Sequence, residues 1–170
     1  KDLGGGVALT LIHEIHLALE LAGFPVSVMG EVSDYNELDL DVDVCSDLMI
    51  KHKAGAVSQI HLDYIQRPSH RSGLVTFEMG WLSYDFTKSE LIGQKKGGEI
   101  HIIWSDQNYD YNKVYINQMM EFVRFVEEGR LKHKYDAKSS VESLTVVESL
   151  FESSSSGKKV NIENNNRFSF

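Results

Sequence analysis

The spacing of apolar and polar residues along the chain follows a helical period first, then a strand period, then a helical period again. Residues 8–22 predict a helix, because their polar positions fall on one stripe at about 100° per residue and the rest of the surface is apolar. Gly23 is placed to end this helix, and Pro25 prevents its continuation. The polar stripe consists of Thr10, His13, Glu14, His16 and Glu20.

From Pro25 to about Trp104 the pattern has a period of two and is rich in good β-formers, which predicts strands. Short glycine turns such as the one at Gly55 predict antiparallel pairing between neighbouring strands. The stretch 89–98, which contains glycines and lysines, is predicted to be a loop. The predicted strands cover 25–33, 42–53, 56–67, 72–79, 81–86 and 99–104.

Two more helices are predicted towards the C-terminus, over 112–128 and about 140–153. Gly129 ends the first, and Ser139 with Glu142 has capping-box spacing at the start of the second. The serine-rich stretch that follows is predicted to break order. The predicted apolar stripe of the first is Val114, Met119, Met120, Val123 and Val126, and the predicted buried side of the second is Val141, Leu144, Val147 and Phe151.

This order of elements predicts an α+β fold with an open, mostly antiparallel β-sheet and helices packed on one face. We expect one domain over 1–162 and a flexible tail over 163–170. The other face of the sheet must then be polar or buried against something else.

Composition and charge narrow the class of protein. Hydrophobic residues make up 42% and charged residues 25%, as in soluble globular domains, and no apolar run has the length of a membrane span. The net charge of −8 argues against nucleic acid or an anionic membrane as the main partner. Cys45 is the single cysteine, so no internal disulfide can form and a cytoplasmic location is expected.

His13 and His16 share one face of the first helix, three residues apart. Zincin sites place histidines at i and i+4 with a glutamate after the first, so this pair has the glutamate but not the spacing. The alternatives are a hydrogen-bonded or solvated polar stripe, and a catalytic histidine able to exchange a proton at neutral pH.

The glycines before that helix, Gly4 to Gly6, also allow two interpretations. Free N–H groups at a helix start can hold a phosphate, but this is neither a Walker loop nor G-x-G-x-x-G. A flexible or close-packed start to the helix is the simpler interpretation.

Two further stretches carry polar side chains suited to a ligand. In 61–71, strand alternation places His61, Asp63, Ile65 and Arg67 on one face, which can hydrogen-bond a polyhydroxylated ligand or be an ordinary solvent face. The acidic and aromatic stretch 104–112 has a composition used for sugar contacts, but a plain turn with a helix cap at Asp110 or Asn112 is the favoured interpretation.

Several of these pieces occur in a familiar order: "GGGVALTLIHEIHLALELAGFPVSV", "GAVSQIHLDYIQRP", "FEMGWLSYDF", "MMEFVRFVEEG" and "SSSSGKKV". Together, over about residues 3–162, they resemble the C-terminal domain of the Gfo/Idh/MocA family of NAD(P)-dependent oxidoreductases, closest to its sugar and nucleotide-sugar dehydrogenases. The resemblance implies a parent enzyme whose N-terminal Rossmann domain binds NAD or NADP and ends near a Glu-Lys-Pro motif with a catalytic lysine. This chain contains neither G-x-G-x-x-G nor Glu-Lys-Pro, so under this resemblance it is expected to correspond to the C-terminal domain only.

The resemblance also implies roles for particular residues. His13 matches the family histidine that exchanges a proton with the substrate hydroxyl during hydride transfer. Relatives carry aspartates where this chain has Thr10 and His16, so the negative charge that would favour a protonated His13 is missing there. Glu14 can replace part of that charge. The family's "DYxQRP" segment is matched here by Tyr64, Gln66 and Arg67. The resemblance implies that some of these residues lie near the substrate or at a subunit contact.

The sequence therefore predicts the substrate-binding and oligomerisation domain of an enzyme that oxidises a secondary alcohol of a sugar or nucleotide sugar. The isolated chain is expected to be inactive and to form homo-oligomers through its open sheet face. The rival hypothesis is a non-catalytic domain that only binds or oligomerises, which the residues at positions 10 and 16 favour. Metal binding by the histidine pair is the third hypothesis.

Overall fold

The computed structural model describes residues 4–34, 40–130 and 137–162. The chain divides into two compact units. The first consists of Lys1–Ile65 together with Lys132–Phe170, and the second consists of Gln66–Leu131. No helix in the described ranges is long and apolar enough to cross a membrane. The predicted single domain over 1–162 stays a prediction, and the predicted tail over 163–170 lies outside the described residues.

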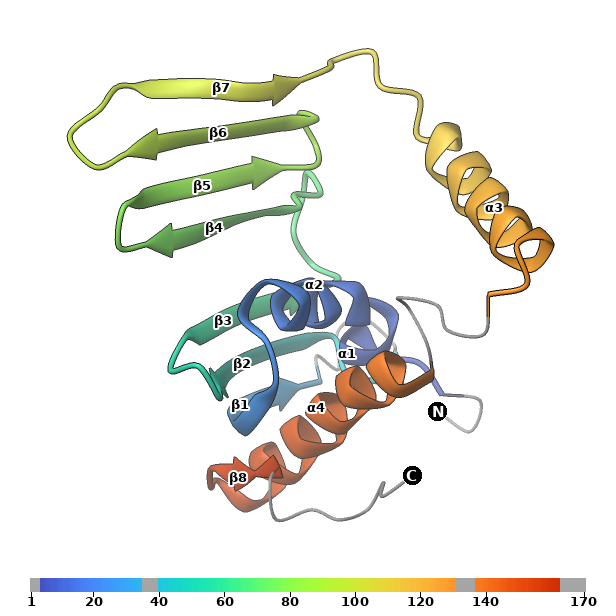
Figure 1. Cartoon of the computed structure of the whole chain (residues 1–170). Coiled ribbons are helices and arrows are strands. Elements are labelled where there is room, and N and C mark those ends of the chain that lie inside the picture. The colour runs from blue at the N-terminus through green and yellow to red at the C-terminus, as the bar shows by residue number, and fades with distance from the viewer. Residues whose placement is uncertain (1–3, 35–39, 131–136, 163–170) are drawn as a thin grey trace. The chain divides into compact units, whose positions relative to one another are not determined.

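The first unit combines a small antiparallel sheet with three helical segments (Figure 1). Its sheet has the order β3-β2-β1-β8. The predicted strands are confirmed here, with β1 matching its predicted bounds and the next two ending earlier than expected. The elements are α1 (Val7–Thr10), α2 (Ile12–Ala22), β1 (Pro25–Ser33), β2 (Cys45–His52), β3 (Val57–Asp63), α4 (Ala137–Ser156) and β8 (Val160–Asn161).

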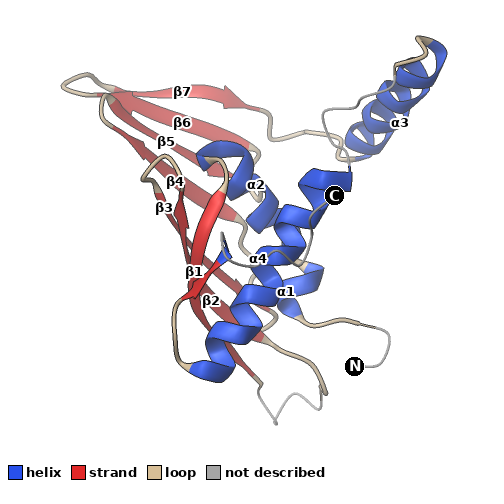
Figure 2. Cartoon of the chain, turned by 60° about the horizontal axis from the view of Figure 1, so that its bottom comes forward, coloured by secondary structure: helices blue, strands red, loops and turns tan. Residues whose placement is uncertain are grey.

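Helices cover one face of this sheet, and the hydrophobic core lies between the two layers (Figure 2). Strand β2 shows the division clearly, because Leu48 and Ile50 are buried under the helices while Asp47 and Met49 are exposed on the opposite face. We call this opposite face the open face. The main core residues are Ile15 and Leu19 of α2, Val28 of β1, and Val146, Val147 and Leu150 of α4.

The serine-rich stretch does not break order, contrary to the prediction, because α4 continues through it to Ser156. β8 pairs with β1 only at Ser27 and Val28. Further along the same edge of β1, the Gly30 N–H donates to Ser153 Oγ at 3.1 Å and the Val32 N–H donates to Ser154 Oγ at 3.0 Å. Helix hydroxyls therefore satisfy edge amides that another strand would otherwise bind.

The buried side of α4 also differs from the prediction. Of the four residues expected there, Val147 is buried, whereas Leu144 and Phe151 are 43% and 37% exposed. The buried side includes Ser143, Ser149 and Ser153 together with Val146 and Leu150. An apolar pattern misses a helix face on which serines are buried. Ser139 lies inside α4, since the helix begins at Ala137, so it is not the N-cap.

The second unit is an antiparallel four-stranded sheet followed by one helix. The predicted loop over 89–98 is wrong, because Glu90–Lys95 forms strand β6 between β5 and β7. Gly93 is not a loop signal here, since a Cβ on it would lie 2.7 Å from Leu82 Cδ2 and 2.9 Å from Ile103 Cδ1. The elements are β4 (Ser72–Phe77), β5 (Gly80–Asp85), β6 (Glu90–Lys95), β7 (Ile100–Ser105) and α3 (Asn112–Glu127).

Helix α3 confirms the predicted helix over 112–128, and the carboxylate of Asp110 accepts the Asn112 N–H at 3.0 Å at its start. Its expected apolar stripe is exposed, and no described residue of α3 is buried. Overall, the predicted α+β class with antiparallel pairing is confirmed, with the strands arranged in two four-stranded sheets.

Candidate functional site

The glycine run leads into α1 through a close contact with Asp43. Gly6 has φ 94° and ψ 161°, a backbone conformation that side chains strongly disfavour, and a Cβ on it would lie 1.8 Å from Asp43 Oδ1. The Asp43 carboxylate accepts the Ala8 N–H at 2.9 Å, and its main-chain carbonyl accepts the Val7 N–H at 2.9 Å. Asp43 therefore caps the start of α1 from 35 residues away.

This cap bears directly on the phosphate interpretation of Gly4 to Gly6. The first amides of α1 already donate to Asp43, and a carboxylate occupies the place where a phosphate would sit. The close-packed interpretation of the glycines fits the structure. The described residues do not offer a phosphate site for a dinucleotide here.

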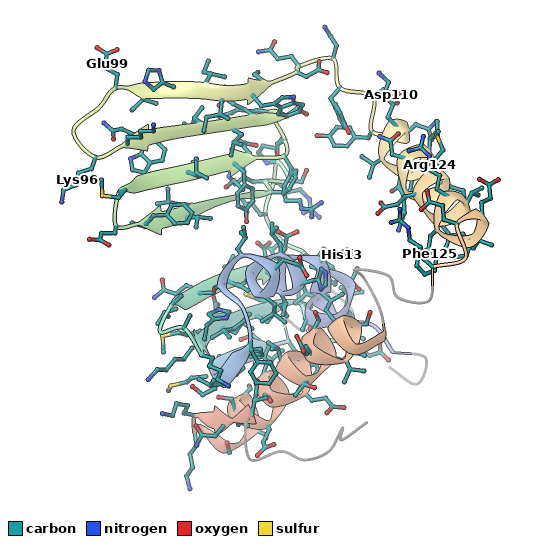
Figure 3. All side chains as sticks on the ribbon, viewed as in Figure 1. His13, Lys96, Glu99, Asp110, Arg124 and Phe125 are labelled. Carbon is teal, nitrogen blue, oxygen red and sulfur yellow. The ribbon has the colours of Figure 1, made fainter. Side chains whose placement is uncertain are left out.

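The predicted helix over 8–22 is interrupted once, at Leu11, which separates α1 from α2. Val7 and Ala8 before the break and Ile15 and Leu19 after it are buried, so both segments are anchored in the core. His13 lies on the outward side of α2 and is exposed (Figure 3). The helical segment thus holds an accessible imidazole on a firmly packed element.

The other stripe residues have different surroundings. Thr10 is exposed at the end of α1, and Glu14 is half-buried on α2. His16 is half-buried, and its Nδ1 lies 3.2 Å from Ser143 Oγ of α4. The structure thus gives His16 a contact that ties α2 to α4. Among the described residues, no group of three metal-type ligands includes His13 or His16.

The residues of the "DYxQRP" segment divide between the two units. Tyr64 belongs to the first unit, is half-buried, and donates its main-chain N–H to Val44 O at 3.0 Å. Gln66 and Arg67 belong to the second unit and are exposed, with Arg67 Nη1 donating to the Gln66 carbonyl at 2.8 Å. Their predicted roles at the substrate or a subunit contact stay predictions.

A second cluster lies on the open face of the first unit. His61 of β3 is opposite Asp47 of β2, and their Nδ1 and Oδ1 atoms are 2.7 Å apart. On its other side, His61 Nε2 lies 3.3 Å from Asp63 Oδ2. Cys45 Sγ lies 3.9 Å from Asp47 Oδ2. The predicted alternation of His61 and Asp63 on one face is confirmed, and β2 adds Cys45 and Asp47 to it.

The carboxylates of this cluster disfavour negative charge and favour positive charge on their neighbours. The hydrogen bond to Asp47 raises the pKa of His61 above its ordinary value of 6.5. Burial, together with the charges of Asp47 and Asp63, raises the pKa of the Cys45 thiol. The side chain of Cys45 is therefore a thiol rather than a thiolate at neutral pH.

Sequence reasoning missed three partners in these sites. Asp43 and Ser143 act across 35 and 127 residues, so no local spacing could indicate them. Asp47 had a weaker signal, because strand alternation over 42–53 places it on the same face as Cys45. The pairing of β2 with β3, which adds His61, required the register.

Several solved oxidoreductases share this fold. The chain matches the aldose-aldose oxidoreductase from Caulobacter crescentus complexed with glycerol, at 18% identity and a TM-score of 0.75, over 88% of this chain and 45% of that one. It matches levoglucosan dehydrogenase in complex with NADH and levoglucosan at 17% identity and a TM-score of 0.77, over 89% and 48% of the two chains. The fold is that of Gfo/Idh/MocA-type oxidoreductases.

A third match is an oxidoreductase from Agrobacterium radiobacter in complex with NAD+, L-tartaric acid and magnesium, at 14% identity and a TM-score of 0.73, over 89% of this chain and 47% of that one. The chain spans just under half the length of each of these three proteins. No family model and no curated protein sequence matches it. The likeness is therefore one of fold, and it agrees with the family that the motifs resemble.

Proposed function

We propose that this chain is the substrate-binding and oligomerisation part of an NAD(P)-dependent oxidoreductase that oxidises a secondary alcohol of a sugar or nucleotide sugar. The observation that carries the proposal is the fold match, over nearly nine-tenths of this chain, to just under half of an aldose oxidoreductase and of a levoglucosan dehydrogenase. The chain spans just under half the length of these two oxidoreductases, so a separate nicotinamide-binding domain would hold the cofactor. The chain alone is then expected neither to bind NAD(H) tightly nor to turn over.

In this proposal His13 is the acid/base for the substrate hydroxyl. Its exposure on α2 leaves the imidazole accessible, while Ile15 and Leu19 fix the helix beneath it. An imidazole can accept a proton as an alcohol is oxidised and return it in the reverse direction. Thr10, Glu14 and His16 are proposed as substrate contacts near this position in the sequence. Tyr64, Gln66 and Arg67 are proposed to contact the substrate or another subunit.

The decisive variant is His13→Asn, measured in the protein that joins this chain to a nicotinamide-binding domain. A general acid/base accounts for about 10²–10⁴-fold in rate, so kcat should fall by that factor. Glu20→Gln is the matched control, because Glu20 is exposed on the same helix and has no assigned role. Undiminished turnover in His13→Asn removes His13 from the mechanism.

A second variant tests the missing charge. Thr10→Asp places a carboxylate at a position where relatives carry one, and a nearby negative charge favours the protonated imidazole. The pKa in the pH profile of kcat/KM should therefore rise. An unchanged profile shows that position 10 does not act on His13.

One observation supports assembly through the sheets, which the enzyme and the non-catalytic alternative both include. Strand β7 of the second unit is exposed along its whole length and carries Ile100, Ile102 and Trp104, which are 59%, 67% and 45% exposed. Contiguous exposed apolar surface is typical of interaction sites. Light scattering after size-exclusion chromatography measures the assembly, and Ile102→Lys should weaken it. The outcome that separates the two hypotheses is measured in the protein that joins this chain to a nicotinamide-binding domain. If that protein forms oligomers but does not bind NAD(P), the non-catalytic alternative is favoured over the enzyme.

A further inference from the structure

We propose that Cys45, Asp47 and His61 form a binding site for one zinc-type divalent metal ion on the open face of the first unit. One donor atom from each residue, a thiol sulfur, a carboxylate oxygen and an imidazole nitrogen, lies within 4.8 Å of the other two. This inference is independent of the proposed function, because no residue assigned to the sugar site takes part in it.

The strand ladder holds the three side chains in place. Cys45 and Asp47 are two residues apart on β2, so they point to the same face. Asp47 and His61 are directly opposite in the antiparallel register of β2 and β3, and Cys45 is opposite Asp63 in the same way. Metal sites on strands are more precise than sites on loops, because backbone hydrogen bonds fix the spacing of the ligands.

The distances suit a tetrahedral ion after small movements. Zn–S bonds near 2.3 Å and Zn–N or Zn–O bonds near 2.0–2.1 Å place neighbouring ligand atoms roughly 3.3–3.8 Å apart. Cys45 Sγ and Asp47 Oδ2 are 3.9 Å apart, close to that range. His61 Nδ1 and Asp47 Oδ1 are 2.7 Å apart, as expected when a proton occupies the place between them that a metal ion would take. They would separate by about half an ångström when the ion binds.

Asp63 completes the arrangement behind the histidine. Its Oδ2 lies 3.3 Å from His61 Nε2, on the side of the ring away from Asp47. Histidines that bind metals through one nitrogen usually give the other N–H to a carboxylate, which fixes the ring and strengthens the ligand. Asp63 is 11% exposed and is therefore held more firmly than Asp47 and His61, which are 65% and 56% exposed.

The donor set and its charge select the ion. Thiolate, imidazole and carboxylate together are zinc ligands, whereas magnesium and calcium prefer oxygen ligands alone. The carboxylates of Asp47 and Asp63 favour a cation at this point for the same electrostatic reason that they raise the pKa of Cys45 and His61. Three protein ligands on an exposed face leave the fourth position of the ion to water.

The single cysteine makes cobalt a selective probe of this site. Co²⁺ takes the place of zinc, and a thiolate-to-cobalt charge-transfer band in the whole 170-residue chain can arise only from Cys45. We expect one equivalent of Co²⁺ to produce this band together with the strong visible bands of tetrahedral cobalt, and one equivalent of Zn²⁺ to abolish both. Zinc should also slow alkylation of Cys45.

Three variants and a control complete the test. Cys45→Ser should remove the charge-transfer band, and Asp47→Asn and His61→Asn should each weaken zinc binding at least about tenfold in competition with a chromogenic chelator. His101→Asn is the matched control, since His101 is an exposed strand histidine of the second unit and should leave affinity unchanged. Far-UV circular dichroism checks that each variant is folded. Absence of the band, or equal zinc affinity in wild type and all three variants, overturns the proposal.

Discussion

Replacing Gly6 with alanine should destabilise the first unit more than its backbone conformation alone explains. Alanine at φ 94° and ψ 161° costs about 1–3 kcal/mol in backbone strain. The new Cβ also meets the Asp43 carboxylate at 1.8 Å, so that carboxylate must leave Ala8, and the lost cap costs about 1 kcal/mol more. We therefore expect the free energy of unfolding to fall by about 2–4 kcal/mol.

Gly23→Ala provides the matched control for this variant. Gly23 ends α2 with φ 82° and ψ −165°, in the same backbone region, and nothing lies within 4 Å of a Cβ there. Its replacement should cost the strain alone. In thermal unfolding followed by circular dichroism, Gly6→Ala should therefore melt about 2–4 °C below Gly23→Ala, as expected for a further loss of about 1 kcal/mol in a chain of this size.

A double-mutant cycle with Asp43→Ala separates the two contributions. Asp43→Ala removes both the cap and the obstacle, so adding Gly6→Ala to it should cost only the strain. The double variant should thus be more stable than the sum of the two single changes. Two results would refute the close packing of the Asp43 carboxylate against Gly6. One is strict additivity of the two changes, and the other is a Gly6→Ala variant no less stable than the Gly23→Ala variant.

Three further predictions concern histidine contacts and strand packing. In protein freed of metal with EDTA, NMR titration should give His61 a pKa above 6.5, and Asp47→Asn should return this pKa towards 6.5. The stability that the His61–Asp47 pair contributes should be greatest below pH 6.5 and should be lost as the pH rises through the raised pKa. His52→Ala should lower the free energy of unfolding by about 2–3 kcal/mol, because His52 is buried with Nδ1 2.7 Å from Gly23 O and Nε2 2.9 Å from Ser58 Oγ. Gly93→Ala should destabilise the second unit by about 1–3 kcal/mol, since its Cβ would lie 2.7 Å from Leu82 Cδ2.

Each of these three predictions has a result that contradicts it. A His61 pKa at or below 6.5, or one unchanged by Asp47→Asn, would show that Asp47 is not its partner. His101→Ala, at an exposed histidine, should change stability by less than about 0.5 kcal/mol, so an equal loss in His52→Ala would argue against the two buried contacts. Gly98→Ala is the control for Gly93, because its nearest contact would be 3.3 Å away, so an equal loss of stability in both variants would argue against close packing at Gly93.

Most of the elements of this fold could be predicted from periodicity, because their apolar residues recur at the spacing of a helix or a strand. The errors occurred where serines or a glycine take the place of large apolar residues on a buried side. Buried serines on α4 made the predicted buried face of that helix wrong. Gly93 suggested a loop, whereas it lies in a strand at a position where close packing leaves no room for a side chain. In both places the contact with another element, rather than the local pattern, determined the structure.

The candidate sites were predictable to different degrees for the same reason. The exposure of His13 and the shared face of His61 and Asp63 follow from helix and strand geometry. The contact of His16 with Ser143 and the cap of Asp43 join distant parts of the chain, which a single sequence without register does not reveal.

The hydroxyls of Ser153 and Ser154 also determine where a shortened version of this chain can end. A chain cut before Ser153 would expose the amides of Gly30 and Val32 along β1 as well as lose β8. Exposed edge amides recruit strands from other molecules, so such a truncation should aggregate, while a chain ending after Ile162, which is 6% exposed in the core, should remain dispersed. Two serines from a run of four, which resembles a dispensable linker, thus cover an edge of β1 that would otherwise be open to an added strand.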